Sequence, residues 1–210
     1  IYNKALSRVD HIVAISDFVK STIINTYKIN ENKITVINRG VDTKFFNAEV
    51  NDDNNFINFL DKYNLSSEKK IILYPGRLTE WKGQINFLKI MESYNDDQII
   101  CYFAGDDKNK SYASKLIGEI KKKNLQQNCK IIGHLSKEDL RMMYICADIV
   151  ISAPLKPEGF GRVISESLAM KKIILCYNYG GAKDQLNGLD KIYKVSPNDQ
   201  AEMRNKIYKI

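Results

Sequence analysis

The sequence has few of the residues that mark fibrous, low-complexity or membrane-spanning proteins. Only 4 prolines, 11 glycines and 1 tryptophan occur in 210 residues, which excludes a collagen-like or linker-like chain. No window approaches the roughly 18 uninterrupted apolar residues of a membrane span, and the opening Ile-Tyr-Asn-Lys is no signal peptide. With 44% hydrophobic residues, we expect a soluble globular chain of one domain, or one domain and part of another.

Cysteine and histidine are also scarce, which argues against a disulfide framework or a zinc site. The four cysteines form no Cys-x-x-Cys pair, and three of them adjoin aliphatic runs, so we expect buried, reduced thiols. The two histidines, His11 and His134, lie far apart in the sequence and show no metal-ligand spacing. The sequence therefore predicts a reducing compartment and no metal site.

Basic residues outnumber acidic ones, 32 to 25, giving a formal net charge of +7 and a pI near 9.1. One explanation is a solvated lysine-rich surface, since lysine, asparagine and isoleucine are abundant throughout the chain; Lys121–Lys123 and the tail Lys206–Lys209 fit it. The alternative is attraction to phosphate groups or to an anionic membrane. Basic and aromatic residues do not alternate as they would for nucleic acid, which we do not expect as a partner.

Short aliphatic runs alternate with segments of helical spacing, which is typical of an α/β fold. Near-continuous apolar runs suit strands that are buried on both faces of a parallel sheet. The predicted strands are 11–15, 34–37, 70–74, 99–104, 130–132, 148–152, 173–176 and 191–195. The predicted helices are 17–27, 84–94, 111–123, 137–146 and 162–170, with Ser16 and Ser136 as N-caps. This order predicts a doubly wound, Rossmann-like parallel sheet with right-handed crossovers.

The polar, acidic stretch Glu49–Asn55 interrupts the alternation, and we predict a solvated linker or loop there. Residues 1–44 have the pattern of strand, helix and strand followed by a turn at Arg39-Gly40. A single such unit cannot bury both of its faces. We therefore expect residues 1–44 to be the last unit and hinge of a mostly missing N-terminal domain, and residues 45–210 to form a C-terminal domain.

Ligands of open parallel sheets bind beyond the carboxyl ends of the strands, and glycine occurs in five of the turns that follow predicted strands. Glycine is common in such loops, so each turn alone indicates little, but five at one edge favour a ligand cleft. In the first turn, Arg77 and Lys82 could together neutralise a diphosphate without a metal ion. The alternative is a pair of solvated surface cations.

Glu158 and Glu166 flank the start of a predicted helix, in a Glu-x7-Glu spacing that chance alone explains. Their sequence context supports a ligand site more than their spacing does, because Gly159-Phe160-Gly161 leads into a helix whose N-terminus would attract a phosphate group. Two carboxylates beside a phosphate would repel it unless they face sugar hydroxyls. The combination suits a ligand with a diphosphate centre and hydroxyl-rich flanks, such as a nucleotide sugar.

Taken together and in order, these motifs resemble the retaining group 1 (family four) glycosyltransferases, which have the GT-B architecture of two Rossmann-like domains facing a cleft. The matching segments are Arg39-Gly40-Val41-Asp42, Pro75-Gly76-Arg77-Leu78 with Lys82-Gly83, Ala104-Gly105-Asp106, and Pro157-Glu158-Gly159-Phe160-Gly161 with Glu166. The resemblance implies the C-terminal, donor-binding half. It also implies a UDP- or GDP-sugar donor, a glycan or lipid-linked acceptor, no cofactor and no metal.

The resemblance also implies roles for the matching positions. Gly76, Arg77 and Lys82 would grip the donor diphosphate, Glu158 would face the donor sugar, and Glu166 would hold the ribose hydroxyls. The backbone of Gly159, Phe160 and Gly161 would contact sugar and phosphate, and Gly133, His134 and Leu135 would cradle the base. Glu158, Arg77 and Lys82 are thus the expected catalytic residues.

Two positions depart from the family pattern: Lys171-Lys172-Ile173 replaces Gly-x-Pro, and Asp184 replaces a usual Glu. Both concern the subgroup more than the fold. The missing N-terminal domain would carry most acceptor contacts and a histidine near the donor sugar, a place that neither His11 nor His134 occupies.

Two other classes of function stay open. One is a non-catalytic module that binds a nucleotide or a partner protein. Such a module would have no need to keep all four of the charged residues Arg77, Lys82, Glu158 and Glu166. The other is a nucleotide-sugar epimerase of the same architecture, which the Pro157–Glu166 segment fits less well. For a transferase, the resemblance and the basicity suggest a cytoplasmic enzyme, peripheral to the inner face of the membrane, in lipopolysaccharide or capsule assembly.

Overall fold

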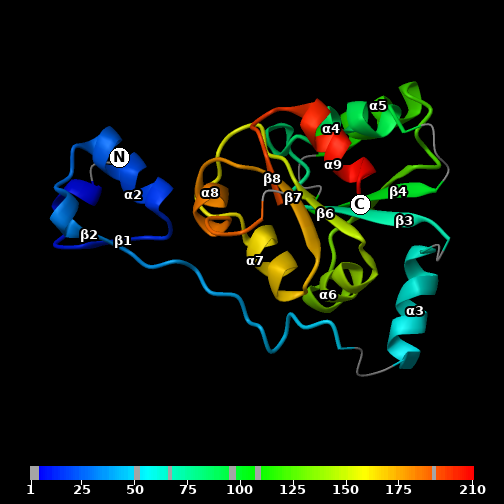
Figure 1. Ribbon diagram of the computed structural model, residues 1–210, viewed down its shortest axis with the longest axis horizontal. Helices are drawn as coiled ribbons and strands as arrows, with labels where there is room; N and C mark the ends of the chain where they lie inside the picture. Colours follow the sequence, from blue (N-terminus) through cyan, green and yellow to red (C-terminus); the bar gives the residue numbers. More distant parts are fainter. Residues whose placement is uncertain (1–4, 50–52, 66–67, 95–97, 107–109, 191–192) are drawn as a thin grey trace.

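A six-stranded parallel sheet forms the centre of the larger part of the molecule in this computed structural model (Figure 1). The structure describes residues 5–49, 53–65, 68–94, 98–106, 110–190 and 193–210. The strands are β3 (Lys70–Pro75), β4 (Ile99–Ala104), β5 (Cys129–Gly133), β6 (Ile149–Ser152), β7 (Ile173–Tyr177) and β8 (Lys194–Val195). Their order is β5-β4-β3-β6-β7-β8, all parallel, so the direction of winding reverses between β3 and β6. This is the doubly wound, Rossmann-like sheet that the sequence predicts.

Helices cover both faces of the sheet, because alternate residues of each strand point to opposite sides. Along β3, Ile72 and Tyr74 join the core under one layer, whereas Ile71 and Leu73 join the core under the other. The first layer consists of α4 (Gln84–Glu92), α5 (Lys110–Lys122) and α9 (Gln200–Tyr208). The second contains α3 (Asp53–Tyr63), α6 (Lys137–Cys146), α7 (Arg162–Ala169) and α8 (Gly181–Gln185).

The N-terminal residues form a separate small unit of β1 (Ile12–Ala14), α2 (Asp17–Tyr27) and β2 (Ile34–Val36), with β1 and β2 parallel. Its own core includes Ile12, Ile23 and Ile34. On the opposite face of β1, Val13 is 57% exposed, as expected for a unit that covers its strands on one side only. Short 3-10 turns at Leu6–Arg8, Glu31–Lys33 and Glu80–Lys82 complete the described elements.

The predicted strands and helices are confirmed wherever the structure describes them, with small shifts at their ends. Both predicted N-caps are correct: the Ser16 hydroxyl accepts the Val19 N–H at 3.1 Å, and the Ser136 hydroxyl accepts the Asp139 N–H at 2.9 Å. The last predicted strand, 191–195, retains only Lys194–Val195 among the described residues, since 191 and 192 lie outside them.

The predicted linker at Glu49–Asn55 is wrong in its last three residues. Helix α3 begins at Asp53, while residues 50–52 lie outside the described ranges. The reason is an apolar stripe further along: Phe56, Phe59, Leu60 and Tyr63 recur at helical spacing, and Phe59 is 3% exposed against the second layer's core. Burial of that stripe extends the helix back into the polar residues.

The cysteines behave as predicted. Cys101, Cys129 and Cys176 are buried, Cys146 is half-buried, and all four are free thiols. Burial raises the pKa of Cys129 and Cys176 to about 12, so these thiols stay protonated and inert.

Within the described ranges, no helix is both long and apolar enough to cross a bilayer.

Candidate functional site

A cavity of about 830 Å³ lies beyond the carboxyl ends of β3 and β6, where the strand order reverses. Loops that follow β3, β4, β5 and β6 line it, although they are far apart in the sequence. Ten of the predicted site residues line this cavity: Gly76, Arg77, Lys82, His134, Leu135, Glu158, Gly159, Phe160, Gly161 and Glu166. Gly133 is not part of the lining; it ends β5, where its carbonyl accepts the Gly105 N–H at 2.7 Å.

The loop after β3 packs directly on the loop after β4. A Cβ at Gly105 would stand 1.9 Å from the Gly76 carbonyl oxygen, so only glycine lets the two backbones approach this closely. Between them, the Leu78 N–H donates to the Asp106 carbonyl at 3.1 Å, and the buried Gln84 side chain donates to the Arg77 carbonyl at 2.9 Å. This fixed backbone presents the exposed Arg77 side chain at the cavity.

Lys82 is held through its backbone as well as its side chain. The buried Tyr74 hydroxyl donates to the Lys82 carbonyl at 2.5 Å, and burial raises the Tyr74 pKa, so this hydroxyl remains a donor. The next residue, Gly83, has a φ of 82°, and a Cβ there would lie 2.4 Å from the Ala153 carbonyl oxygen. The Leu155 N–H donates to the Trp81 carbonyl at 2.7 Å, which ties the β3 loop to the β6 loop.

The Lys82 ammonium forms an ion pair with the Glu158 carboxylate across the cavity. The two side chains are 14% and 15% exposed, and the Lys82 Nζ also lies 4.6 Å from the centroid of the Trp81 ring. Both partners come from the residue set predicted for the donor, but their pairing with each other was not predicted. Any ligand that binds Lys82 or Glu158 must therefore compete with this contact.

Glu166 lies inside α7, as predicted, and is 5% exposed. Its Oε2 accepts the Tyr144 hydroxyl at 3.0 Å, while its Oε1 accepts the Arg162 Nη2 at 2.8 Å and Nε at 3.2 Å. Burial raises the pKa of Tyr144, which keeps its hydroxyl protonated as a donor. The contacts of Tyr144 and Arg162 with this carboxylate were not predicted; the sequence places these two residues only within the predicted helices 137–146 and 162–170.

Helix α7 starts at the cavity and presents its positive end there. Gly161 is its N-cap, and no side chain caps the helix. The preceding loop is tied to the N-terminal unit, because the Ser16 hydroxyl donates to the Gly159 carbonyl at 2.6 Å and the Asp184 carboxylate accepts the Phe18 N–H at 2.9 Å. An anion at this end of α7 would be stabilised by the helix dipole.

The charges that line the cavity nearly balance. Arg39, Arg77, Lys82 and Arg162 face three carboxylates from Asp106, Glu158 and Glu166. Arg39 was quoted in the sequence only as part of a motif, and the structure adds it to the lining. In the described part of the chain, no group of three or more His, Cys, Asp or Glu side chains is placed to hold a metal ion. Cations beside carboxylates suit a ligand that combines an anionic centre with hydroxyl groups.

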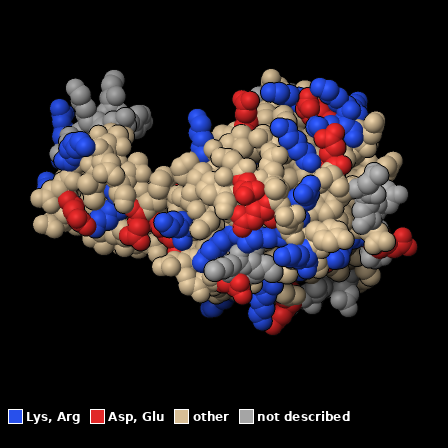
Figure 2. All heavy atoms as spheres, turned by 45° about the horizontal axis from the view of Figure 1, so that its top comes forward, with Lys and Arg blue, Asp and Glu red and all other residues tan. Residues whose placement is uncertain are grey.

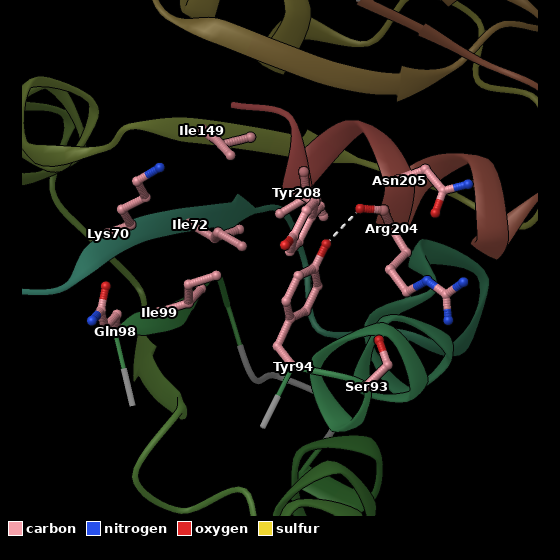
Figure 3. A pocket seen from close by; sticks show the side chains of 11 residues that line it. Lys70, Ile72, Ser93, Tyr94, Gln98, Ile99, Ile149, Arg204, Asn205 and Tyr208 are labelled. Atoms are coloured by element: carbon pink, nitrogen blue, oxygen red, sulfur yellow. Dashed lines mark hydrogen bonds between the residues drawn. The ribbon is translucent and has the colours of Figure 1, made fainter. Parts of the chain in front are cut away.

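A second cavity, of about 630 Å³, lies at the opposite edge of the sheet (Figure 3). Its lining includes Lys70, Ile99 and Ile149, the first residues of β3, β4 and β6, together with Ser93 and Tyr94, which follow α4, and residues of α9. The Tyr94 hydroxyl crosses it to donate to the Arg204 carbonyl at 2.5 Å. Since ligands of doubly wound sheets bind at the carboxyl edge, the first cavity is the candidate site.

The doubly wound sheet and the cleft at its switch point define a Rossmann-like α/β domain of the kind from which GT-B glycosyltransferases are built. Residues 55–210 match the family described as Glycosyl transferases group 1, and residues 1–45 match Glycosyltransferase Family 4. The chain therefore belongs to the group 1 glycosyltransferases, the family that its motifs resemble.

Individual proteins agree with this assignment. The chain is 26% identical over 199 residues to an uncharacterised glycosyltransferase of Methanocaldococcus jannaschii, covering 90% of this chain and 48% of the relative. It is 28% identical over 211 residues to the capsular polysaccharide biosynthesis glycosyltransferase CapM of Staphylococcus aureus, covering 95% and 51%. The chain thus spans about half the length of the curated relatives it matches.

Solved structures show the same fold. A glycosyltransferase from Rickettsia africae ESF-5 superposes with a TM-score of 0.88 at 32% identity, covering 99% of this chain and 55% of that one. Anabaena HepE, solved in complex with UDP and glucose, superposes with a TM-score of 0.84 at 19% identity, covering 98% and 55%. At 19% identity, the second comparison concerns the fold alone.

Proposed function

We propose that this chain is the donor-binding part of a retaining glycosyltransferase that transfers a sugar from a UDP- or GDP-sugar to a glycan or lipid-linked acceptor. The observation that carries the proposal is the meeting of Arg77, Lys82, Glu158 and Glu166 in one cavity at the switch point of the sheet. UDP and glucose in the similarly folded HepE support a nucleotide-sugar donor. The name of CapM supports a role in capsule, lipopolysaccharide or other surface polysaccharide synthesis.

The diphosphate would lie between Arg77, Lys82 and the N-terminus of α7. On binding, Lys82 would exchange the Glu158 carboxylate for a phosphate oxygen, and the freed carboxylate would accept hydroxyl groups of the donor sugar. When the bond to the sugar breaks, negative charge grows on the leaving diphosphate. The two cations and the helix dipole would stabilise that charge without a metal ion. Retention of the anomeric configuration rests on the family resemblance.

Glu166 would hold the ribose hydroxyls. The Tyr144 hydroxyl fixes one oxygen of this carboxylate from within the core, while the exposed Arg162 covers the other. A ribose hydroxyl would therefore approach Oε1 and displace Arg162. The base would lie against residues 133–135, of which His134 and Leu135 line the cavity.

The remaining half of such a transferase would supply the acceptor site. We propose that residues 1–44 belong to that other domain and that residues 45–210 form the donor domain. The Ser16–Gly159 hydrogen bond would then connect the acceptor side directly to the donor loop. A cytoplasmic enzyme that works at the inner face of a membrane fits this role.

Calorimetric titration with UDP, GDP and ADP, first without metal and then with magnesium, tests the donor assignment. We expect one nucleotide to bind without metal. Arg77→Ala should weaken that binding by about 2–4 kcal/mol, the cost of a lost charge-assisted contact whose partner stays unpaired. Lys89→Ala is the matched control, since Lys89 is exposed on α4 outside the cavity. Equal nucleotide affinity in both variants would contradict the diphosphate site and favour a non-catalytic interaction module.

A further inference from the structure

Neutral hydrogen-bond donors have to contribute to any phosphate site in the cleft, because opposite charges offset one another there. Cations and carboxylates nearly balance in the lining of the cavity. On the face that Figure 2 shows, Asp and Glu are likewise interspersed with Lys and Arg over the larger part of the molecule. Backbone N–H groups attract an anion without a side-chain charge. Binding of a phosphate group therefore depends on what orients the backbone of residues 158–161, the donor loop.

Helix α8 and the turn before it support the donor loop by direct backbone contact. A Cβ at Gly180 would lie 2.7 Å from the Glu158 carbonyl oxygen, and one at Gly181 would lie 2.4 Å from the Gly159 carbonyl oxygen. Glycine at both positions lets the two segments approach this closely. The Gly181 N–H also donates to the Glu158 carbonyl at 2.8 Å. The side chains of α8 are therefore held at a fixed place beside the loop.

The last residue of α8, Gln185, donates to two successive carbonyl groups of the donor loop. Its Nε2 donates to the Phe160 carbonyl and, at 3.2 Å, to the Gly161 carbonyl. The Ser165 hydroxyl of the adjacent helix α7 (Figure 1) donates to the Gln185 Oε1 at 2.5 Å. Because a carbonyl oxygen can only accept, the amide is oriented with its nitrogen toward the loop. One side chain thus fixes two peptide groups.

The two fixed carbonyl groups set the direction of two N–H groups. In a planar trans peptide, the carbonyl of one residue and the N–H of the next point in opposite directions. Gln185 therefore turns the N–H groups of Gly161 and Arg162 away from α8. Both residues line the cavity, and neither N–H donates a hydrogen bond in the part of the chain that the structure describes. They are free to meet a phosphate oxygen at the start of α7.

We propose that Gln185 is a positioning residue, which holds the donor loop so that the N–H groups of Gly161 and Arg162 bind the donor diphosphate. Gln185 itself is outside the lining of the cavity, so it acts only through the loop. Ser165 contributes by keeping the Gln185 amide in the orientation that the loop requires. This role rests on the proposed donor site, and it adds to that site a residue outside the motifs of the sequence.

The Gln185 amide also lies close to the Glu158 carboxylate, which restricts the substitution that can test its role. A Cβ at Gly161 would lie 3.8 Å from the Gln185 Nε2 and 3.6 Å from the Glu158 Oε2. Gln185→Glu would place a second carboxylate in this region and repel a phosphate by charge alone. Methionine is uncharged, unbranched and of similar length, so Gln185→Met removes the two hydrogen bonds and little else.

Binding of a nucleoside diphosphate and of the corresponding nucleoside to Gln185→Met tests the proposal. We expect the variant to lose about tenfold in affinity for the diphosphate by calorimetry, because the freed carbonyl groups let the two N–H groups turn. The nucleoside keeps the base and the ribose but has no phosphate, so its affinity, measured by NMR titration, should change by less than about twofold. Gln127→Met is the control, since Gln127 is exposed and does not line the cavity, and it should retain both affinities. Thermal unfolding checks that each variant is folded.

Ser165→Ala tests the same contact without a change at residue 185. It should weaken diphosphate binding about threefold, because the amide is then free to rotate, and it should add no further loss to Gln185→Met. Equal losses for the diphosphate and the nucleoside in Gln185→Met would mean a purely structural role and would overturn the proposal, as would full diphosphate affinity in both single variants. If the unaltered chain bound no nucleoside diphosphate, the donor site itself would fail and this role with it.

Discussion

The Lys82–Glu158 pair leads to a prediction that runs against simple intuition: neutralising a residue of the site should strengthen nucleotide binding. In the free chain, the Lys82 ammonium is engaged by Glu158, and the pair is largely shielded from water, with side chains 14% and 15% exposed. A diphosphate must displace that carboxylate and then lie beside it. The substitution Glu158→Gln removes both penalties while keeping the shape of the side chain.

The structure sets the scale of the effect. Exposed ion pairs contribute about 0–1 kcal/mol, whereas removal of one partner from a buried pair costs about 3–5 kcal/mol. A pair that keeps about a seventh of its surface exposed falls between these limits. We therefore expect Glu158→Gln to tighten binding of UDP or GDP by about 1–2 kcal/mol, roughly 5- to 30-fold. Sugar transfer by the complete enzyme should nevertheless fall, because the carboxylate no longer faces the donor sugar.

Calorimetric titration of the variant with the nucleotide that binds best measures the effect directly. Glu138→Gln is the control, since Glu138 is an exposed carboxylate of α6 that does not line the cavity. Thermal unfolding of both variants checks that the fold is retained. Unchanged or weaker nucleotide binding in Glu158→Gln would refute the reasoning, because it would mean that Lys82 does not exchange this carboxylate for phosphate.

Three further predictions concern the surroundings of the site and the core. Tyr144→Phe should weaken nucleotide binding about tenfold, because the Glu166 carboxylate loses the hydroxyl donor that orients it. Tyr102→Phe, which also alters a buried tyrosine, is the control and should leave nucleotide binding unchanged. Equal losses in both variants would show that Tyr144 does not position Glu166. Gly105→Ala should lower the free energy of unfolding by about 2 kcal/mol or more, since the new methyl group meets a backbone carbonyl. Gly118→Ala, in open space on α5, should raise it by about 1 kcal/mol, and denaturant unfolding that ranked the two variants the other way would contradict the packing. The free energy of unfolding should also decline above about pH 9, because the Cys176 thiol of the unfolded chain releases its proton there, while burial raises its pKa in the folded chain to about 12. Cys176→Ala should reduce that decline in denaturant titrations at pH 8 and 10. A decline in the variant as large as in the unaltered chain would exclude this thiol as a cause.

The fold could be predicted because its evidence is local. Aliphatic runs such as Ile99–Ala104 are buried on both faces, and the composition and length of the run alone predict that burial. The N-caps at Ser16 and Ser136 likewise depend on neighbours three residues away. Helices α3, α8 and α9 were not predicted. The apolar stripe of α3 follows an acidic, polar start, α8 is only five residues long, and α9 is mostly polar, with Met203 and Ile207 as its buried side chains.

The candidate site could be predicted as a set of residues but not as a set of contacts. Arg77, Lys82, Glu158 and Glu166 follow from motifs in their loops. Which of them touch one another depends on the strand order, which places the loop after β3 beside the loop after β6.

The sequence by itself determined the family, the doubly wound fold and ten of the residues that line the cleft, because each of these follows from short stretches of the chain. Only the tertiary structure decided the Lys82–Glu158 pair and the Tyr144 hydroxyl on Glu166. The physical reason is distance along the chain: 76 residues separate Lys82 from Glu158, and 22 separate Tyr144 from Glu166. Such contacts follow from the crossovers of the sheet, which bring together segments whose local sequences carry no information about each other.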